Sequence, residues 1–174
     1  MAPELFAAAF AAGIVVKLVD QIEDDGLKLK NTALLFGLFY GFLLAYVMIK
    51  SSLAANLWMA AVLANVLAGK IDAPGHRLGV FSMLFILSII GFPKFDASLL
   101  ALFALAAYAD EFLEGLGERK KIKNKSLSKI ARLRAVLEIT AFAVSVYTGQ
   151  WTLFALILLF DAGYIAASVR AGKY

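Results

Sequence analysis

The sequence predicts an all-α integral membrane protein, a bundle of about seven transmembrane helices that forms a single domain over residues 1–174. Three observations predict this fold class. Hydrophobic residues make up 62% of the chain and charged residues 17%, with a mean hydropathy of +0.82, whereas soluble domains are about 45 to 50% apolar. The apolar residues fall into long runs separated by short polar segments. Lysine and arginine gather in alternate connecting segments, as they do in cytoplasmic loops.

The apolar runs are expected to form the membrane-spanning helices. Most of them are close to the lower limit of the roughly 17 to 25 residues that cross a bilayer. The fourth run is short enough to be re-entrant, so six spans are an alternative. Short polar segments at 50–52 and 148–150 predict tight turns between consecutive helices. The runs cover residues 3–19, 33–49, 53–69, 78–92, 97–113, 135–147 and 151–169.

The orientation follows from the distribution of positive charge. If the N-terminus lies outside, all of the 17 lysines and arginines except Lys50 and Lys94 fall on the cytoplasmic side. We therefore expect a multi-pass protein of the cell membrane with its N-terminus outside and its C-terminus inside. The basic loop at 116–134 is expected to rest on anionic lipid headgroups. The chain has no cysteine, which excludes a thiolate metal site, and no nucleic-acid partner is expected.

Similar features recur in the two halves of the chain and predict an internal duplication. Residues 20–26 and 110–115 each place two acids four positions apart and then a glycine, at the end of the first and the fifth run. This pattern predicts parallel repeats at 3–72 and 96–172, joined by a linker helix at 78–92. Three helices, a linker helix and three further helices resemble the topology of the sugar carriers called SWEETs.

The two acidic pairs are candidate metal ligands. Positions four apart lie on one helix face, so Asp20 pairs with Asp24, and Asp110 pairs with Glu114. If the two helices are equivalent, these four carboxylates converge on one ion. Ligands that are all oxygen favour Mg²⁺ or a similar hard cation. The alternative is that acids following a membrane span are ordinary solvated residues paired with lysines, which is the interpretation we adopt for Glu23, Asp25 and Glu118.

Asp161 lies in the middle of the last apolar run, where its side chain is too short to reach water. A charge inside a membrane is costly and usually faces the interior of a bundle. We expect it to pair with a cation such as Lys17 or Lys70, to line a polar cavity, or to remain neutral and bond to a neighbouring helix. The candidate catalytic residues are Asp20, Asp110, Lys70 and Asp161.

The segment 65–77 closes the third run with an unusual density of polar residues and glycines. Its cations and its glycine backbone could contact an anion, although the spacing of glycine and lysine is not that of a P-loop. As a lone histidine, His76 is interpreted as an ordinary loop histidine in preference to a catalyst. The candidate ligand-binding residues are Lys17, Asn65, His76 and Arg77.

The paired motifs at Asp20 and Asp24 and at Asp110 and Glu114 resemble the two aspartate-rich motifs of UbiA-type membrane prenyltransferases. The resemblance covers only these short segments. Those enzymes are longer, and their first motif begins with an asparagine that this chain lacks. Membership of that family is therefore not inferred.

Carboxylates beside lysine and arginine at the cytoplasmic boundary suit a substrate with an apolar tail and a phosphate head. The leading hypothesis is a Mg²⁺-dependent membrane enzyme acting on a lipid or isoprenoid phosphate or diphosphate, with the metal and the basic residues stabilising charge on the leaving group. The alternative is a small transporter of a cation or a proton-coupled solute, with Asp161 in its path. A third hypothesis is a non-catalytic helical subunit, and a homo-oligomer is compatible with all three.

Overall fold

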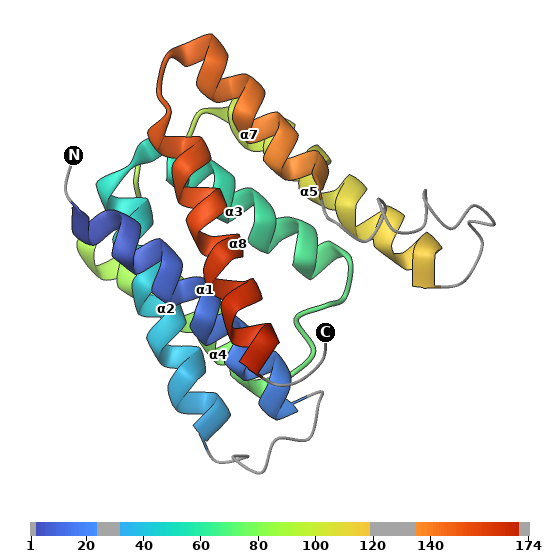
Figure 1. The fold of residues 1–174 in the computed structure, drawn as a ribbon. Helices are drawn as coiled ribbons and strands as arrows, with labels where there is room; N and C mark the ends of the chain where they lie inside the picture. The colour runs from blue at the N-terminus through green and yellow to red at the C-terminus, as the bar shows by residue number, and fades with distance from the viewer. Residues whose placement is uncertain (1–2, 24–31, 119–134, 171–174) are drawn as a thin grey trace. The chain divides into compact units, whose positions relative to one another are not determined.

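The computed structural model describes residues 3–23, 32–118 and 135–170, and within these ranges it contains helices and no strands (Figure 1). The prediction of an all-α fold is confirmed there. Each of the predicted apolar runs coincides with a helix. The described helices are α1 (Pro3–Glu23), α2 (Ala33–Lys50), α3 (Ser52–Leu67), α4 (Pro74–Ile90), α5 (Ala97–Glu118), α7 (Ala135–Thr148) and α8 (Thr152–Arg170).

Local signals in the sequence set several helix ends. Helix α4 begins at Pro74, ahead of the predicted apolar run, because proline at the first helical position gives up no intrahelical hydrogen bond. The Ser51 hydroxyl accepts a hydrogen bond from the backbone N–H of Ala54 at 3.2 Å and caps α3. Gly149 has a φ of 70° in the short connection between α7 and α8, a conformation that glycine adopts readily. Both predicted tight turns therefore lie where they were expected.

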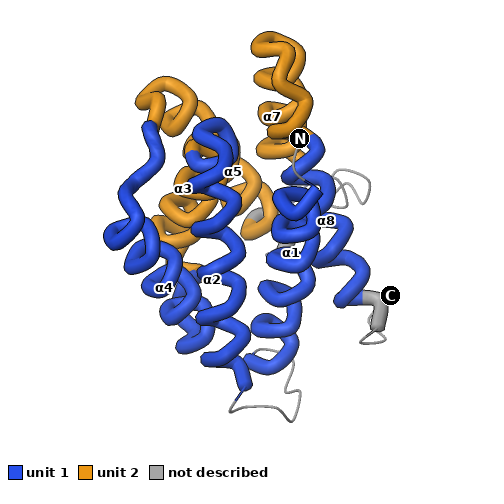
Figure 2. The backbone as a smooth tube through the Cα atoms, turned by 90° about the vertical axis from the view of Figure 1, so that its left-hand side faces the viewer, with its two compact units in different colours: residues 1–55, 71–94, 155–174 blue, residues 56–70, 95–154 orange. Residues whose placement is uncertain are grey.

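The chain divides into two compact units (Figure 2). Unit 1 holds α1, α2, α4 and most of α8, and unit 2 holds most of α3 together with α5 and α7. Each unit draws on both of the predicted repeats, so the internal duplication remains a prediction. Unit 1 comprises residues 1–55, 71–94 and 155–174, and unit 2 comprises residues 56–70 and 95–154.

Helices α2 and α4 of unit 1 run parallel and touch through glycines. A Cβ atom added to Gly37 would lie 2.3 Å from the carbonyl oxygen of Gly75, and one added to Gly41 would lie 2.2 Å from that of Gly79. The contacts advance by one turn on both helices, which fixes the common direction. Two Gly-x-x-x-Gly segments thus bring the backbones together, an arrangement that stabilises helix pairs in membranes through van der Waals contact.

Helices α1 and α8 of unit 1 are also parallel and closely packed. A Cβ atom on Gly13 would lie 1.9 Å from the carbonyl oxygen of Phe160, and one on Gly163 would meet the backbone of α1 in the same way. Two turns farther along α1, the buried Gln21 side chain donates a hydrogen bond to the carbonyl oxygen of Ala167 at 3.1 Å. Helix α2 contacts both α1 and α4. The ends of α1 and α8 and the starts of α2 and α4 therefore share one end of unit 1.

Unit 2 repeats this pattern of directions. Near the start of α3, the Asn56 side-chain oxygen accepts the backbone N–H of Asp96, which directly precedes α5, at 3.0 Å. After the end of α3, Lys70 forms ion pairs with Glu111 and Glu114 near the end of α5. Helices α3 and α5 are therefore parallel, and α5 also contacts α7.

Helices α2 and α4 bury their paired glycines together with some larger side chains, and they also expose many large apolar side chains. Large exposed apolar surfaces mark sites of contact with a partner or a membrane. By length and composition, α1 and α2 could cross a membrane, whereas the other apolar helices, α3, α4, α7 and the apolar part of α8, are shorter. These features favour membrane association. The exposed side chains include Leu35, Phe39, Phe42, Phe81, Phe85 and Ile89.

The structure describes the predicted linker helix but only a small part of the predicted basic loop. The predicted linker helix at 78–92 corresponds to most of α4, which packs against α2 in unit 1. The predicted basic loop at 116–134 lies outside the described residues except for the last turn of α5. Its contact with anionic headgroups remains a prediction.

Candidate functional site

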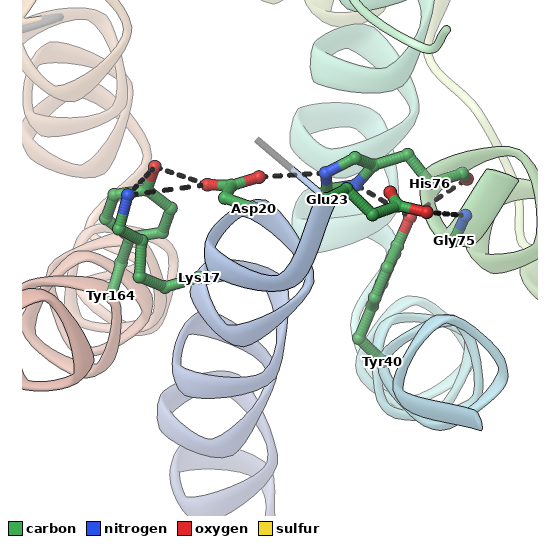
Figure 3. A network of polar contacts seen from close by, with 7 residues as sticks. All are labelled: Lys17, Asp20, Glu23, Tyr40, Gly75, His76 and Tyr164. Atoms are coloured by element: carbon green, nitrogen blue, oxygen red, sulfur yellow. Dashed lines mark hydrogen bonds and ion pairs between the residues drawn. The ribbon is translucent and has the colours of Figure 1, made fainter. Parts of the chain in front are cut away.

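A cluster of polar side chains lies at the end of unit 1 where α1 finishes and α4 begins. Figure 3 shows its members converging from four helices. We call it the Asp20 cluster, after the carboxylate at its centre. Its members are Lys17 and Asp20 from α1, Tyr40 from α2, His76 from α4 and Tyr164 from α8.

Asp20 connects three of these helices through one carboxylate. Its Oδ1 lies 2.8 Å from His76 Nε2, and its Oδ2 accepts a hydrogen bond from the Tyr164 hydroxyl at 2.5 Å. The Lys17 ammonium lies 3.9 Å from Oδ2, donates to the Tyr164 hydroxyl at 3.4 Å, and sits 4.9 Å from the centre of the Tyr164 ring. The side chains of Lys17, Asp20 and His76 are 17%, 20% and 17% exposed. The carboxylate is therefore largely removed from solvent and supported by several donors.

Both ring nitrogens of His76 face oxygen atoms. Nε2 faces Asp20, and Nδ1 lies 3.4 Å from the hydroxyl of Tyr40. The same hydroxyl donates a hydrogen bond to the His76 backbone carbonyl at 3.0 Å. His76 is thus part of a packed polar network, and the interpretation as an ordinary loop histidine is wrong.

Glu23 extends the network to the first turn of α4. Its Oε1 accepts the backbone N–H of Gly75 at 2.7 Å, one of the donors that a helix N-terminus leaves without an intrahelical partner. Negative charge near a helix N-terminus is also favoured by the helix dipole. Its Oε2 is buried and has no hydrogen-bond partner among the described residues. The interpretation of Glu23 as a solvated residue is therefore wrong.

The acidic segment of α5 makes a separate set of contacts within unit 2. Lys70 is ion-paired with Glu111 and Glu114. The two oxygens of Asp110 accept the backbone N–H groups of Val136 and Leu137, at 2.9 Å and 2.8 Å. Since α7 begins at residue 135, Asp110 caps the N-terminus of a neighbouring helix.

The other described candidate residues are Asn65, Arg77 and Asp161. Asn65 donates its amide to the carbonyl oxygen of Ala61 in its own helix, and Arg77 is exposed, with Nε lying 3.4 Å from a loop carbonyl oxygen. Asp161 is partly exposed on α8, one turn before Tyr164. Asp24 lies outside the described residues.

The predicted magnesium site remains a prediction. Asp20 belongs to unit 1, whereas Asp110 and Glu114 belong to unit 2, and each has protein partners of its own. Within 3–23, 32–118 and 135–170, no group of three or more His, Asp or Glu side chains is placed to hold a metal ion.

Sequence reasoning missed Tyr40, Tyr164 and Glu111. Tyrosines in apolar helices are usually read as packing residues, and their polar ends reveal a role only once a partner is known. Two signals were available in retrospect. Tyr40 stands directly before the second glycine of a Gly-x-x-x-Gly segment, and Tyr164 lies one turn after Asp161.

No protein-family model matches this chain, no curated protein matches its sequence, and no solved structure matches its fold.

Proposed function

We propose that this protein is an integral membrane enzyme that acts on the phosphate or diphosphate head of a lipid or isoprenoid at the cytoplasmic membrane face. The Asp20 cluster is its catalytic centre. One observation carries the proposal: polar side chains from four helices contact one another in the Asp20 cluster at one end of unit 1, while the buried side chains nearer its other end are apolar. These apolar side chains are Leu5, Ala8, Ala9, Leu44, Ala45, Val47, Met48, Met83 and Leu87.

The helix directions support a seven-span topology with the N-terminus outside. In such a protein the odd-numbered spans are parallel to one another, and so are the even-numbered spans. The pairs α1 with α8, α2 with α4, and α3 with α5 all run parallel, as this alternation requires. The large apolar side chains on the outer faces of α2 and α4 are suited to contact with lipid tails. A polar cluster at one end and an apolar exterior suit an amphiphilic substrate.

In this proposal His76 transfers the proton. Asp20 contacts Nε2, as a carboxylate does in many catalytic histidine pairs. Nδ1 has only the longer contact to Tyr40, and it exchanges a proton with a substrate oxygen. Lys17 supplies positive charge for a phosphate oxygen, and the Tyr164 hydroxyl keeps Asp20 in position. A requirement for Mg²⁺ is a further proposal from the sequence, and no step here depends on the ion.

The test is turnover by purified protein in lipid nanodiscs. A panel of prenyl and phospholipid phosphates and diphosphates is supplied with Mg²⁺ or with a chelator, and products are followed by mass spectrometry. His76→Gln and Asp20→Asn should each lower kcat at least about 100-fold, the lower end of what acid–base catalysis contributes. The matched control is Asp72→Asn, an exposed carboxylate in the connection before α4, which should leave turnover unchanged. Turnover that persists in both cluster variants would refute the proposal.

A proton-coupled carrier is the second candidate. The observation in its favour is that the Asp20 carboxylate joins α1 to both α4 and α8, so its protonation would weaken two helix contacts together. In proteoliposomes with a pH gradient, a carrier should move a cation or solute. Asp20→Asn should abolish that flux, and Asp161→Asn should change its pH dependence. Flux without turnover of any phosphate substrate would favour the carrier over the enzyme.

A further inference from the structure

Tyr40 contacts His76 at two points and is buried within unit 1. The side chain is 4% exposed. Its hydroxyl donates to the His76 carbonyl oxygen at 3.0 Å and lies 3.4 Å from Nδ1 of the same residue. The two aromatic rings are tilted, with their centres 6.0 Å apart. One phenol therefore touches both the backbone and the ring of the residue to which we assign proton transfer.

Gly79 makes this placement sterically feasible. A Cβ atom at Gly79 would lie 2.0 Å from Tyr40 Cζ and 2.1 Å from its hydroxyl oxygen, so any side chain there would displace the phenol ring. The second glycine of the α4 Gly-x-x-x-Gly segment thus does more than let two backbones approach. It forms the surface on which the tyrosine ring rests beside His76.

The hydrogen-bond partners of the imidazole specify one tautomer. Asp20 is a carboxylate and can only accept, so Nε2 carries the proton when the ring is neutral. Nδ1 is then an acceptor, and the Tyr40 hydroxyl is the donor that faces it. That hydroxyl has one proton to share between Nδ1 and the His76 carbonyl oxygen.

We propose that Tyr40, seated on Gly79, is a positioning residue that fixes the ring orientation and the tautomer of His76. It restrains the ring from the side opposite Asp20, so that Nδ1 keeps its direction. The inference rests on the proposed function only where it assigns proton transfer to Nδ1 of His76. The geometry of the imidazole can be measured without any substrate.

The chain contains a single histidine, so ¹⁵N-histidine labelling reports on His76 alone. The protein is studied in nanodiscs at one near-neutral pH. The native protein should give one sharp pair of ring-nitrogen signals, with Nε2 protonated and Nδ1 not. Tyr40→Phe retains the ring and removes the hydroxyl, and it should produce a mixture of tautomers and broadened signals. Tyr46→Phe, on the same helix, is the matched control and should leave the signals unchanged.

A second variant approaches the same contact from the other side. Gly79→Ala keeps the hydroxyl but forces the phenol away from His76, and it should reproduce the signal change seen in Tyr40→Phe. Gly115→Ala is its control, because a Cβ atom there meets nothing within 4 Å. If Gly79→Ala does not fold, Tyr40→Phe decides alone. An unchanged nitrogen pattern in folded Tyr40→Phe would overturn the inference.

Turnover separates the inference from the proposed function. If the enzyme acts on one of the supplied phosphates, Tyr40→Phe should lower kcat about tenfold with little change in KM, because one hydrogen bond that orients the base is lost. A tautomer change in a protein that turns over no phosphate would uphold the positioning role and refute the enzyme. Wild-type kcat in a variant whose tautomers are mixed would refute the role of Tyr40 in catalysis.

Discussion

Asp110 shows that a buried carboxylate can be required by the fold alone. It is 4% exposed, and its two oxygens accept the N–H groups of Val136 and Leu137. A helix N-terminus placed away from water needs such acceptors, because its first N–H groups have none within the helix. Its burial is therefore accounted for without a metal ion.

The capping role predicts how substitutions of Asp110 rank. Asp110→Ala should lower the free energy of unfolding by about 1 to 2 kcal/mol, the upper part of the range for a lost helix cap. Asp110→Asn keeps one acceptor oxygen but turns an amide NH2 group toward the other backbone N–H, so its stability should lie between those of the wild type and Asp110→Ala. Unfolding in detergent, followed by tryptophan fluorescence, measures both. A stable Asp110→Asn variant that loses Mg²⁺-dependent turnover would instead identify Asp110 as a metal ligand.

Individual residues of the site were predictable to different degrees. Lys17 and Asp20 stand out because charges within or at the end of an apolar run need partners, and His76 stands out because it is the only histidine. Tyr40 and Tyr164 were not predictable, because a tyrosine in an apolar helix is favourable for packing whether or not its hydroxyl has a role. Their roles depend on which helices are neighbours, which is a property of the assembled unit.

At the scale of elements, the glycine contacts between α2 and α4 hold the site together. They bring Tyr40 and His76 into contact from separate helices. Gly-x-x-x-Gly spacing was present in the sequence, but spacing alone does not say which two helices pair. The helices themselves were predictable from apolar runs. Their ends were less so, because α1 and α5 continue through polar residues after the apolar run stops.

Gly37→Ala should destabilise the protein by about 1 to 3 kcal/mol, the usual cost of overpacking a tight contact. The added methyl group would meet a backbone carbonyl oxygen at 2.3 Å, and backbone cannot move aside as a side chain does. Thermal unfolding in detergent is the measurement. Gly115→Ala is the control and should be neutral or stabilising, since alanine is the better helix former and the position is open. Equal melting temperatures for the two variants would contradict the tight contact.

At the scale of the whole molecule, the proposed topology predicts which connections face each side of the membrane. The natural chain has no cysteine, so single cysteines can be introduced without background. Exposed Lys50 and Lys94 should be on the outside and exposed Asp72 on the inside. Lys50→Cys and Lys94→Cys should react with a membrane-impermeant maleimide in intact cells, and Asp72→Cys only after permeabilisation. Labelling of Asp72→Cys in intact cells would exclude the proposed topology.

The parallel contact between α1 and α8 has a consequence for biosynthesis. Synthesis proceeds from the N-terminus, so under the proposed topology Lys17 and Asp20 would enter the membrane long before Tyr164 exists. In the interval, a carboxylate and an ammonium in an apolar helix lack a partner that they have in the finished protein, which is unfavourable within lipid. In that topology, the last helix to be inserted would complete the Asp20 cluster. Under the proposed topology, a chain halted before α8 would differ from the finished protein because Asp20 would lack its hydrogen bond from Tyr164, a chemical difference by which unfinished chains could be distinguished from finished ones.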